Sequence, residues 1–295
     1  GPADYPNGII GGYLPNFPSF RNGVALGPFL EEKFGIPVYI NNDADLYAYG
    51  EALAGALPEI NEKLEKLGSA KRYHTLLGYT FGTGFGFGFV TNGELHTGDN
   101  SCIETFCLRH KHMPGVMVED GVAVRAVKRV YKEASGIDDP TLQPKDIFDI
   151  AEGKKEGDAE AAKASFRELG QTAGNAIISA LNIVDGLVVI GGGGSAAAKY
   201  IMPGIMDSMR KDIGTFAGDR FPCLQMKPYN LEDPNEMDAF ITDEGKAYVT
   251  QSDGIKDSVL DMLQMYDNDV FGLVIRIVST DIGNGRTRKI IRIMD

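Results

Sequence analysis

An acidic residue follows a short apolar run near the start of the chain. Asn42 and Asp43 come directly after Ile36–Ile40, where a predicted strand ends and a helical pattern begins at Ala44. An ionised carboxylate at the end of a strand, beside a cleft, can accept a proton from a substrate hydroxyl. The same position favours a helix cap. Asp43 is therefore either a general base or an N-cap residue.

A glycine-rich segment offers a way to bind phosphate. Glycines alternate with phenylalanines from Phe81 to Gly88, around the turn formed by Gly82, Thr83 and Gly84. Backbone amides without a neighbouring side chain approach phosphate oxygens closely, and a threonine hydroxyl adds a donor. A tightly packed β-hairpin would show the same alternation, so both interpretations stay open.

A second glycine run lies between an apolar segment, Gly186–Ile190, and a helical pattern. It consists of Gly191, Gly192, Gly193 and Gly194. A strand, a glycine turn and a helix in this order let backbone N–H groups face a nucleotide. Ala196 stands where the last glycine of the dinucleotide motif would be, so that motif is not met. The alternative is a turn at which a helix packs close to a strand.

Two cysteines and two histidines fall close together. They are Cys102, Cys107, His110 and His112. Such a set can hold zinc in a tetrahedral site, although the spacing is not that of a zinc finger. The sequence raises zinc as a hypothesis only.

Composition limits the class of protein. The chain has 295 residues, enough for two domains, and 43% of them are hydrophobic. A net charge of −12 argues against a general nucleic-acid-binding surface, which needs clustered Lys and Arg. No stretch reaches the roughly 18 apolar residues that span a bilayer. Three cysteines are too few for a disulfide scaffold, so we expect a cytoplasmic protein without nucleic-acid or membrane partners.

The first half of the chain predicts the elements that position these residues. A helix is expected over Val24–Phe34 and a strand over Ile36–Ile40. Two further strands, Leu76–Phe81 and Phe85–Val90, flank the first glycine turn, and Asn92-Gly93 is typical of a type I′ hairpin turn. These elements would hold Asp43 and the glycine turn in one α/β unit.

The second half of the chain is mainly helical until its last segment. Helices are expected over Val122–Glu133, from Pro144, over the long amphipathic Ala159–Ile183, and from about Ser195. Two apolar strands, Phe271–Val278 and Lys289–Met294, are predicted near the end of the chain.

Taken in order, these segments resemble the ROK family, which comprises repressors, open reading frames and sugar kinases. The resemblance covers residues 1 to about 205 and is carried by the following segments: Gly1-Pro2-Ala3-Asp4, Pro15-Asn16, Asn41-Asn42-Asp43-Ala44 with Gly50-Glu51, Phe81–Gly88, Asn92-Gly93-Glu94-Leu95, Glu119-Asp120-Gly121 with Arg125, and Asp185–Gly193.

The resemblance implies a two-lobed α/β fold of the actin-like ATPase (ribonuclease H-like) type, with ATP and a sugar between the lobes. Asp43 would be the general base, Gly82 to Gly84 would bind ATP phosphates and Gly191 to Gly193 would approach the adenosine. Mg²⁺ would offset the phosphate charge. The implied sugar ligands are Asn42, Glu104, Glu119 and Asn16. Taken singly, without the resemblance, each glutamate is better interpreted as an exposed charge.

The sequence departs from the family pattern in three places. Cys107 stands where the family has a histidine, and His110-Lys111-His112 replaces a cysteine-containing zinc loop. Both differences weaken the zinc hypothesis. The first phosphate motif, Asp-x-Gly-Gly-Thr, would precede residue 1, so the N-terminal lobe is expected to be incomplete. Asp281-Ile282-Gly283 resembles that motif at the other end of the chain, by circular permutation or, as we favour, by chance.

These expectations divide the chain into three parts. Residues 1–48 would be the rest of the small N-terminal lobe, residues 49–225 the large lobe, and residues 226–295 an atypical C-terminal segment. The leading function is ATP-dependent phosphorylation of a hexose or hexosamine. A sugar-responsive regulator and a non-catalytic module remain as alternatives, and the family resemblance adds an expected homodimer.

Overall fold

A computed structural model of the chain describes residues 3–11, 18–69, 71–245, 275–281 and 287–293. The chain forms two compact units. The first comprises Gly1–Asn61 and Tyr73–Asn230, and the second comprises Glu62–Arg72 and Leu231–Asp295. All candidate site residues that the structure describes belong to the first unit.

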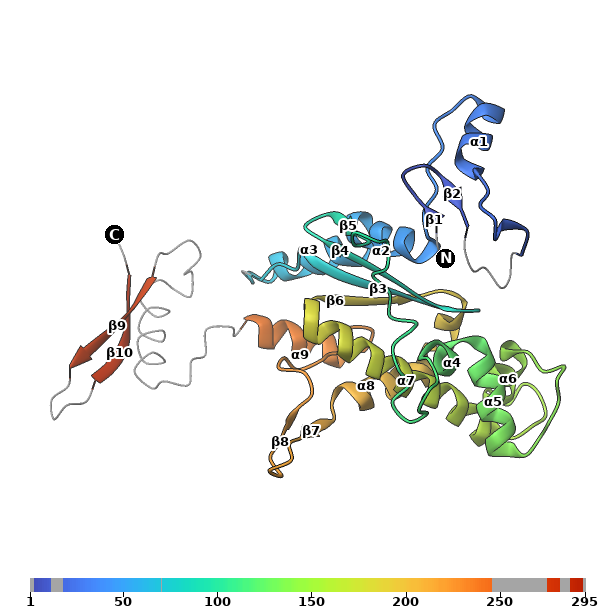
Figure 1. The fold of residues 1–295 in the computed structure, drawn as a ribbon. Helices are drawn as coiled ribbons and strands as arrows, with labels where there is room; N and C mark the ends of the chain where they lie inside the picture. The colour runs from blue at the N-terminus through green and yellow to red at the C-terminus, as the bar shows by residue number, and fades with distance from the viewer. Residues whose placement is uncertain (1–2, 12–17, 70, 246–274, 282–286, 294–295) are drawn as a thin grey trace. The chain divides into compact units, whose positions relative to one another are not determined.

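A four-stranded sheet forms the centre of the first unit (Figure 1). Its order is β5-β4-β3-β6, with β3 parallel to β6 and the other pairs antiparallel. The strands are β3 (Thr75–Phe81), β4 (Phe85–Thr91), β5 (Glu94–His96) and β6 (Leu187–Gly191). The β4–β5 turn has positive φ angles at Asn92 (52°) and Gly93 (78°), as the Asn-Gly pair predicts.

Helices cover both faces of this sheet (Figure 1). One face packs against α2 (Asp43–Ala54). The other face packs against a helical layer built around the long α7. That layer contains α4 (Glu119–Val122), α5 (Val124–Ser135), α6 (Pro144–Ala151), α7 (Ala159–Val184) and α8 (Ala198–Met209), which follows a 3₁₀ turn at Gly193–Ala197.

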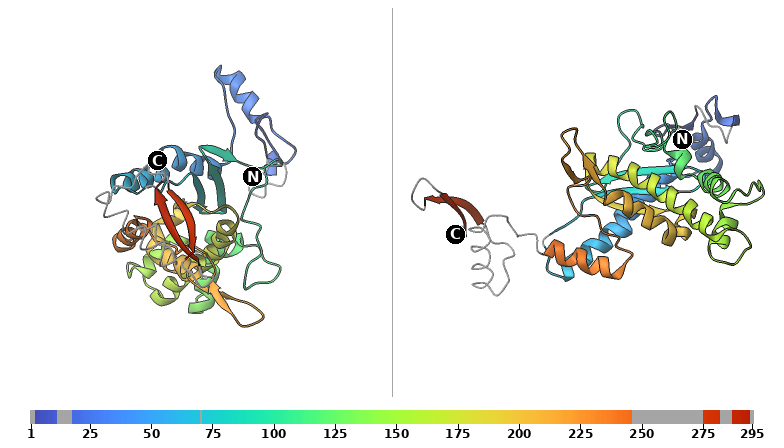
Figure 2. Two further views of the ribbon diagram at one scale, coloured as in Figure 1. Left: turned by 90° about the vertical axis from the view of Figure 1, so that its left-hand side faces the viewer. Right: turned by 90° about the horizontal axis from the view of Figure 1, so that it is seen from below.

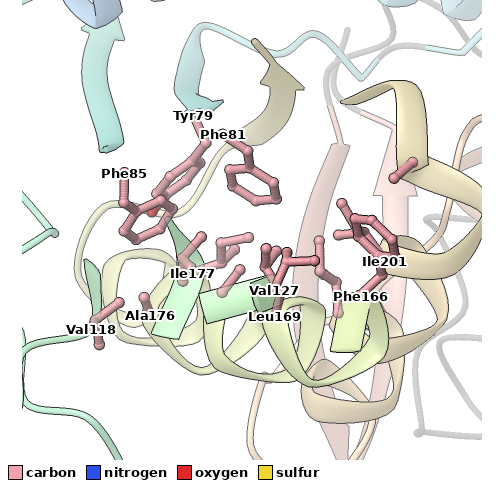
Figure 3. Close-up of a cluster of buried hydrophobic side chains, with 14 of the residues drawn as sticks. Tyr79, Phe81, Phe85, Val118, Val127, Phe166, Leu169, Ala176, Ile177 and Ile201 are labelled. Carbon is pink, nitrogen blue, oxygen red and sulfur yellow. The ribbon is translucent and has the colours of Figure 1, made fainter. Parts of the chain in front are cut away.

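The main core lies between the sheet and α7. Tyr79, Phe81 and Phe85 point from the strands toward Leu169 and Ile177 of α7 (Figure 3). The Tyr79 ring lies 5.3 Å from that of Phe85 and 5.0 Å from that of Phe87, centroid to centroid. Burying each aromatic side chain stabilises the fold by about 1.5–3 kcal/mol, so the phenylalanines of the glycine-rich segment anchor the hairpin.

Close backbone approach joins α7 to α8, which run side by side in the right-hand view of Figure 2. A Cβ atom at Gly174 would lie 2.9 Å from the Ile205 carbonyl oxygen, and one at Gly204 would overlap the Arg167 carbonyl. Only glycine leaves room for this crossing. The glycines within these helices therefore serve packing.

Smaller elements complete the description. The first unit also contains β1 (Ala3–Asp4), β2 (Ile9–Ile10), a 3₁₀ turn (Pro18–Phe20), α1 (Leu26–Phe34) and the hairpin of β7 (Asp212–Gly214) with β8 (Arg220–Pro222). Helix α3 (Ala56–Lys66) runs from the first unit into the second, which contains α9 (Pro234–Gly245) and the antiparallel pair β9 (Ile275–Asp281) and β10 (Thr287–Ile293).

One predicted strand is wrong. Ile36–Ile40 forms no strand, and the Tyr39 side chain is 91% exposed. A strand needs a hydrogen-bonded neighbour, and among the residues that the structure describes none pairs with this segment. The Val38 N–H instead donates to the Glu31 carboxylate, at 3.0 Å.

The other predicted elements are found at nearly the expected places. The helices predicted over Val24–Phe34 and Ala159–Ile183 run over Leu26–Phe34 and Ala159–Val184, and Pro144 opens α6. Of the last two predicted strands, residues 271–274 and 294 lie outside the described residues, and the described parts belong to β9 and β10, which pair antiparallel within the second unit. No helix in the described part of the chain combines the length and apolarity that a membrane crossing requires.

Candidate functional site

The N-terminus of α2 carries the candidate base. The expectation that Asp43 caps this helix is wrong, because Asn42 is the cap residue. The Asn42 Oδ1 atom accepts hydrogen bonds from the backbone N–H of Ala44 (2.8 Å) and Asp45 (3.4 Å). Asp43 is the first helical residue, and its Oδ1 accepts from the Ala44 N–H at 3.0 Å. The capping function thus falls mainly to Asn42, which leaves the second oxygen of Asp43 for other chemistry.

Glycines in the β3–β4 hairpin bring α2 close to the sheet. A Cβ atom at Gly88 would lie 2.6 Å from Ala48 Cβ, and one at Gly86 would lie 2.6 Å from Ala44 Cβ. The alternation of glycine and phenylalanine therefore has two faces: phenylalanines enter the core, and glycines receive α2. For Gly86 and Gly88, the packed-hairpin interpretation is the right one. The packing of Ala44 on Gly86 sets Asp43 toward the turn end of the hairpin.

The turn between β3 and β4 is held from the α4–α5 junction. The Gly82 N–H donates to the Gly84 carbonyl at 3.1 Å, which closes the turn. The Val124 N–H donates to the Gly82 carbonyl at 3.0 Å, and the Phe85 N–H donates to Glu119 Oε2 at 3.1 Å. A Cβ atom at Gly84 would lie 3.0 Å from that same oxygen. Gly84 thus makes room for the Glu119 carboxylate.

Arg125 completes this arrangement. Its guanidinium donates to Glu119 Oε1 (3.0 Å), to Asp120 Oδ1 (2.6 Å) and to the Thr83 carbonyl (3.3 Å). Burial works against the charged guanidinium, but its hydrogen bonds to Asp120 and Glu119 outweigh this and raise the pKa of Arg125. The residue stays cationic at any ordinary pH.

The second glycine turn lies against the end of β3. A Cβ atom at Gly192 would lie 2.7 Å from the Phe81 carbonyl oxygen, and one at Gly194 would lie 2.9 Å from Phe81 Cβ. By contrast, a Cβ atom at Gly82 or Gly193 would meet no atom within 4 Å. The two glycine turns thus meet at one strand end and leave open space beside both, an arrangement that fits a nucleotide.

An acidic cluster surrounds the N-terminus of α2. It consists of Asp43, Asp45 and Glu104. Burial, with repulsion from Asp43, raises the pKa of Asp45 to about 6. Burial, with repulsion from Asp45, Glu119 and Asp43, raises the pKa of Glu104 to about 7. The Glu104 carboxyl therefore exists in both protonation states near neutral pH and can donate or accept a hydrogen bond to a hydroxyl group.

Three site residues were missed by the interpretation of the sequence. Asp45 lies one residue beyond the motif Asn41-Asn42-Asp43-Ala44. Its place in the first turn of the same helix as Asp43 could have indicated that it belongs to the site. The Tyr5 hydroxyl hydrogen-bonds the Asn42 side chain, and its pKa is raised by burial and by Asp45. Arg125 was noted only as part of the resemblance. Tyr5 and Arg125 reach the site through tertiary contacts, which cannot be predicted from a local sequence pattern.

The candidate zinc ligands do not come together as a site. Within the described ranges, no group of three or more His, Cys, Asp and Glu side chains is arranged to hold a metal ion. The Cys102 thiol donates to the Asn100 carbonyl, and Cys107 is exposed. His110 is buried, 3.5 Å from the Thr172 hydroxyl. The candidate sugar ligand Asn16 lies outside the described residues.

Comparison with solved structures shows which fold the chain has. A glucokinase from Parabacteroides distasonis ATCC 8503, known from its crystal structure, superposes with a TM-score of 0.74 at 46% sequence identity. The match covers 98% of this chain and 70% of that chain. The protein has the actin-like ATPase fold.

The family follows from the same comparisons. A family model described as the ROK family matches residues 13–106. Together with the glucokinase match, this shows that the chain belongs to the ROK family.

Curated relatives include both kinases and repressors. The glucokinase of Thermotoga maritima is 35% identical over 98 residues, which are 33% of this chain and 26% of that protein. The DNA-binding transcriptional repressor Mlc of Escherichia coli is 25% identical over 225 residues, which are 72% of this chain and 51% of that protein. The chain spans no more than 60% of the length of the curated relatives that it matches.

Proposed function

We propose that the protein phosphorylates a hydroxyl group of a hexose or hexosamine, with ATP as phosphoryl donor and Asp43 as general base. The observation that carries this proposal is the position of α2 on the hairpin. Ala44 packs on Gly86, so the Asp43 carboxylate lies at the same end of the sheet as the Gly82–Gly84 turn. A proton acceptor and a phosphate-binding turn at one end of a sheet suit phosphoryl transfer to an alcohol.

Each end of the site has its own task in this proposal. Bound ATP supplies the phosphoryl group, and Mg²⁺ offsets the charge of its phosphates. Gly82, Thr83 and Gly84 would hold the phosphates, while Gly191, Gly192 and Gly193 would lie against the adenosine. Asp43 would accept the proton of the sugar hydroxyl as the hydroxyl oxygen bonds to the γ-phosphorus, while the bond between that phosphorus and ADP breaks and ADP leaves. Asn42 and Glu104 would orient the sugar through its other hydroxyl groups, and Glu119, at the start of α4, would contribute a further carboxylate.

Several parts of the proposal rest on the sequence and its family resemblance alone. These are Asn16 as a sugar ligand, a homodimer, a cytoplasmic location, and the division into a small lobe (1–48), a large lobe (49–225) and a C-terminal segment (226–295). The Asp-x-Gly-Gly-Thr motif does not occur in the sequence. A similar segment occupies residues 281–285, and all of it except Asp281 lies outside the described residues. A circular permutation, which would make this segment the missing motif, therefore stays a prediction.

A sugar-responsive regulator is the second candidate. The match to the repressor Mlc, which covers 72% of this chain, favours it. A regulator would use the acidic cluster to bind a sugar without transferring phosphate. Sugar binding without turnover distinguishes it from the kinase.

The test is ADP release from Mg-ATP across a panel of hexoses and hexosamines. We expect turnover by the unaltered chain and a loss of about 10²–10⁴-fold in Asp43→Ala. Glu160→Ala, which removes an acidic residue from the first turn of α7, is the matched control and should keep full activity.

Each result has a separate meaning. Turnover that survives in Asp43→Ala would overturn the general-base role. Sugar binding measured by calorimetry without turnover would favour the regulator, and no sugar binding at all would contradict both candidates.

A further inference from the structure

Arg125 and Glu119 bind the phosphate-binding turn from outside, at main-chain atoms. The Glu119 carboxylate uses its Oε2 atom on the Phe85 N–H and its Oε1 atom on Arg125. The Arg125 guanidinium uses one nitrogen on that carboxylate and another on the Thr83 carbonyl. Two side chains thus fix the main chain on both sides of Gly84.

Arg125 offsets part of the negative charge beside the turn. An ionised Glu119 close to Gly84 would repel a phosphate bound to the same turn. Arg125 carries the opposite charge, and its third contact, the Asp120 carboxylate at 2.6 Å, holds the guanidinium in place. Hydrogen bonds between ionised partners are about twice as strong as neutral ones, so this network is suited to fixing a glycine turn.

The glycines of the turn do not order it by themselves. Gly82 has open space where a side chain would be, and glycine loses more conformational freedom on ordering than any other residue. A phosphate-binding turn that must be ordered by its ligand binds more weakly, because ordering costs free energy. The contacts from Glu119 and Arg125 remove part of that cost before the ligand arrives.

We propose that Arg125 is a positioning residue, which orders the Gly82–Gly84 turn through Glu119 and Thr83 and so sets the affinity of the protein for the phosphates of a nucleotide. This inference rests on the proposed function and deepens it. It gives Glu119 a second task, on the phosphate side of the site, beside the sugar contact that the proposed function assigns to it.

Two measurements test the inference on the full chain. The first is hydrogen exchange of the backbone amides at Gly82–Phe85 in the ligand-free protein, which does not depend on any activity. We expect exchange about tenfold faster in Arg125→Met than in the unaltered chain, with an unchanged melting temperature, because one charge-assisted contact is lost locally. The second is calorimetric titration with Mg-ATP, where we expect binding about tenfold weaker.

Two further variants sharpen the result. Arg129→Met is the matched control, because Arg129 lies one turn further along α5 and pairs with Glu133 and Glu168 rather than with the turn. It should match the unaltered chain in both measurements. Arg125→Lys keeps the charge but not the fork of donors, so it should fall between the two.

The outcomes separate the inference from the proposed function. Unchanged exchange at the turn in Arg125→Met would overturn the inference, and so would faster exchange with unchanged Mg-ATP binding. An unaltered chain that does not bind Mg-ATP would contradict the proposed function, whatever the exchange shows.

Discussion

The two ends of the candidate site hold their acidic residues in opposite ways. At the glycine turn, Glu119 and Asp120 both pair with Arg125. In the acidic cluster, Asp43, Asp45 and Glu104 repel one another electrostatically, and no Lys or Arg in the described part of the chain forms an ion pair with them. Burial, with a smaller contribution from this repulsion, raises the pKa of both Asp45 and Glu104.

This difference indicates what each end does. Paired charges cost little and hold a main-chain turn in one conformation, as a site for a flexible triphosphate requires. Partly buried like charges destabilise the folded state and are retained where a ligand needs them. In the proposed function, the hydroxyl groups of a bound sugar would satisfy these carboxylates and so offset their cost in stability.

The largest expected effect comes from disturbing the packing of α2 on the hairpin, because this packing joins the acidic cluster on α2 to the glycine turn of the hairpin. Gly88→Ala places a Cβ atom 2.6 Å from Ala48 Cβ and 2.8 Å from the Ala44 carbonyl oxygen. We expect this to lower the free energy of unfolding by about 1–3 kcal/mol. Gly82→Ala meets no atom within 4 Å and should change it by less than about 0.5 kcal/mol.

Urea denaturation of both variants measures these effects. Gly82→Ala should also bind Mg-ATP more weakly while it stays folded. Equal destabilisation by the two substitutions would contradict the expectation that Gly88 is packed against α2 whereas Gly82 borders open space.

The cost of the acidic cluster predicts a stability that depends on pH. The pKa of Glu104 is raised to about 7 in the folded protein, so its destabilising ionisation is absent below the ordinary glutamate value and complete above about 7. Glu104→Gln should therefore stabilise the protein at pH 8 and leave it unchanged at pH 4. Because the side chain is only partly buried, solvent screening limits the gain to about 1 kcal/mol.

Thermal unfolding at both pH values measures this gain. The exposed Glu94, in β5, provides the matched control. The effect of Glu94→Gln on the melting temperature should be the same at pH 4 and pH 8. A gain in Glu104→Gln that is the same at pH 4 and pH 8 would show that it does not come from ionisation.

The smallest expected effect separates the two tasks of Asn42. Asn42→Ala removes the cap of α2 and should cost about 1 kcal/mol, whereas Asn42→Ser keeps a capping oxygen and should cost only a few tenths. Both variants lose the amide that the proposed function assigns to the sugar. Chemical denaturation together with sugar titration distinguishes the cap from the ligand, and equal loss of stability in both variants would argue against the capping contact.

Much of this protein follows from local sequence. Apolar periodicity, Asn-Gly at the hairpin and Pro144 at a helix start predict the elements of the first unit, because each depends on residues close in the chain. The ordered motifs from Asn42 to Gly193 indicate the family in the same way. Ile36–Ile40 shows the limit of local information, since β-branched residues favour a strand but only a neighbouring strand makes one.

Tertiary structure decided what the motif residues do. The glycines of Phe81–Gly88 look alike in the sequence, yet Gly86 and Gly88 receive α2 while Gly82 borders open space. Glu119 is expected from the sequence as a sugar ligand, and the structure adds the contacts of its carboxylate with the Phe85 N–H and Arg125. The cap of α2 fell to Asn42 rather than Asp43. The sequence determined which residue types were available, whereas their partners depended on contacts between segments far apart in the chain, which carry no local pattern.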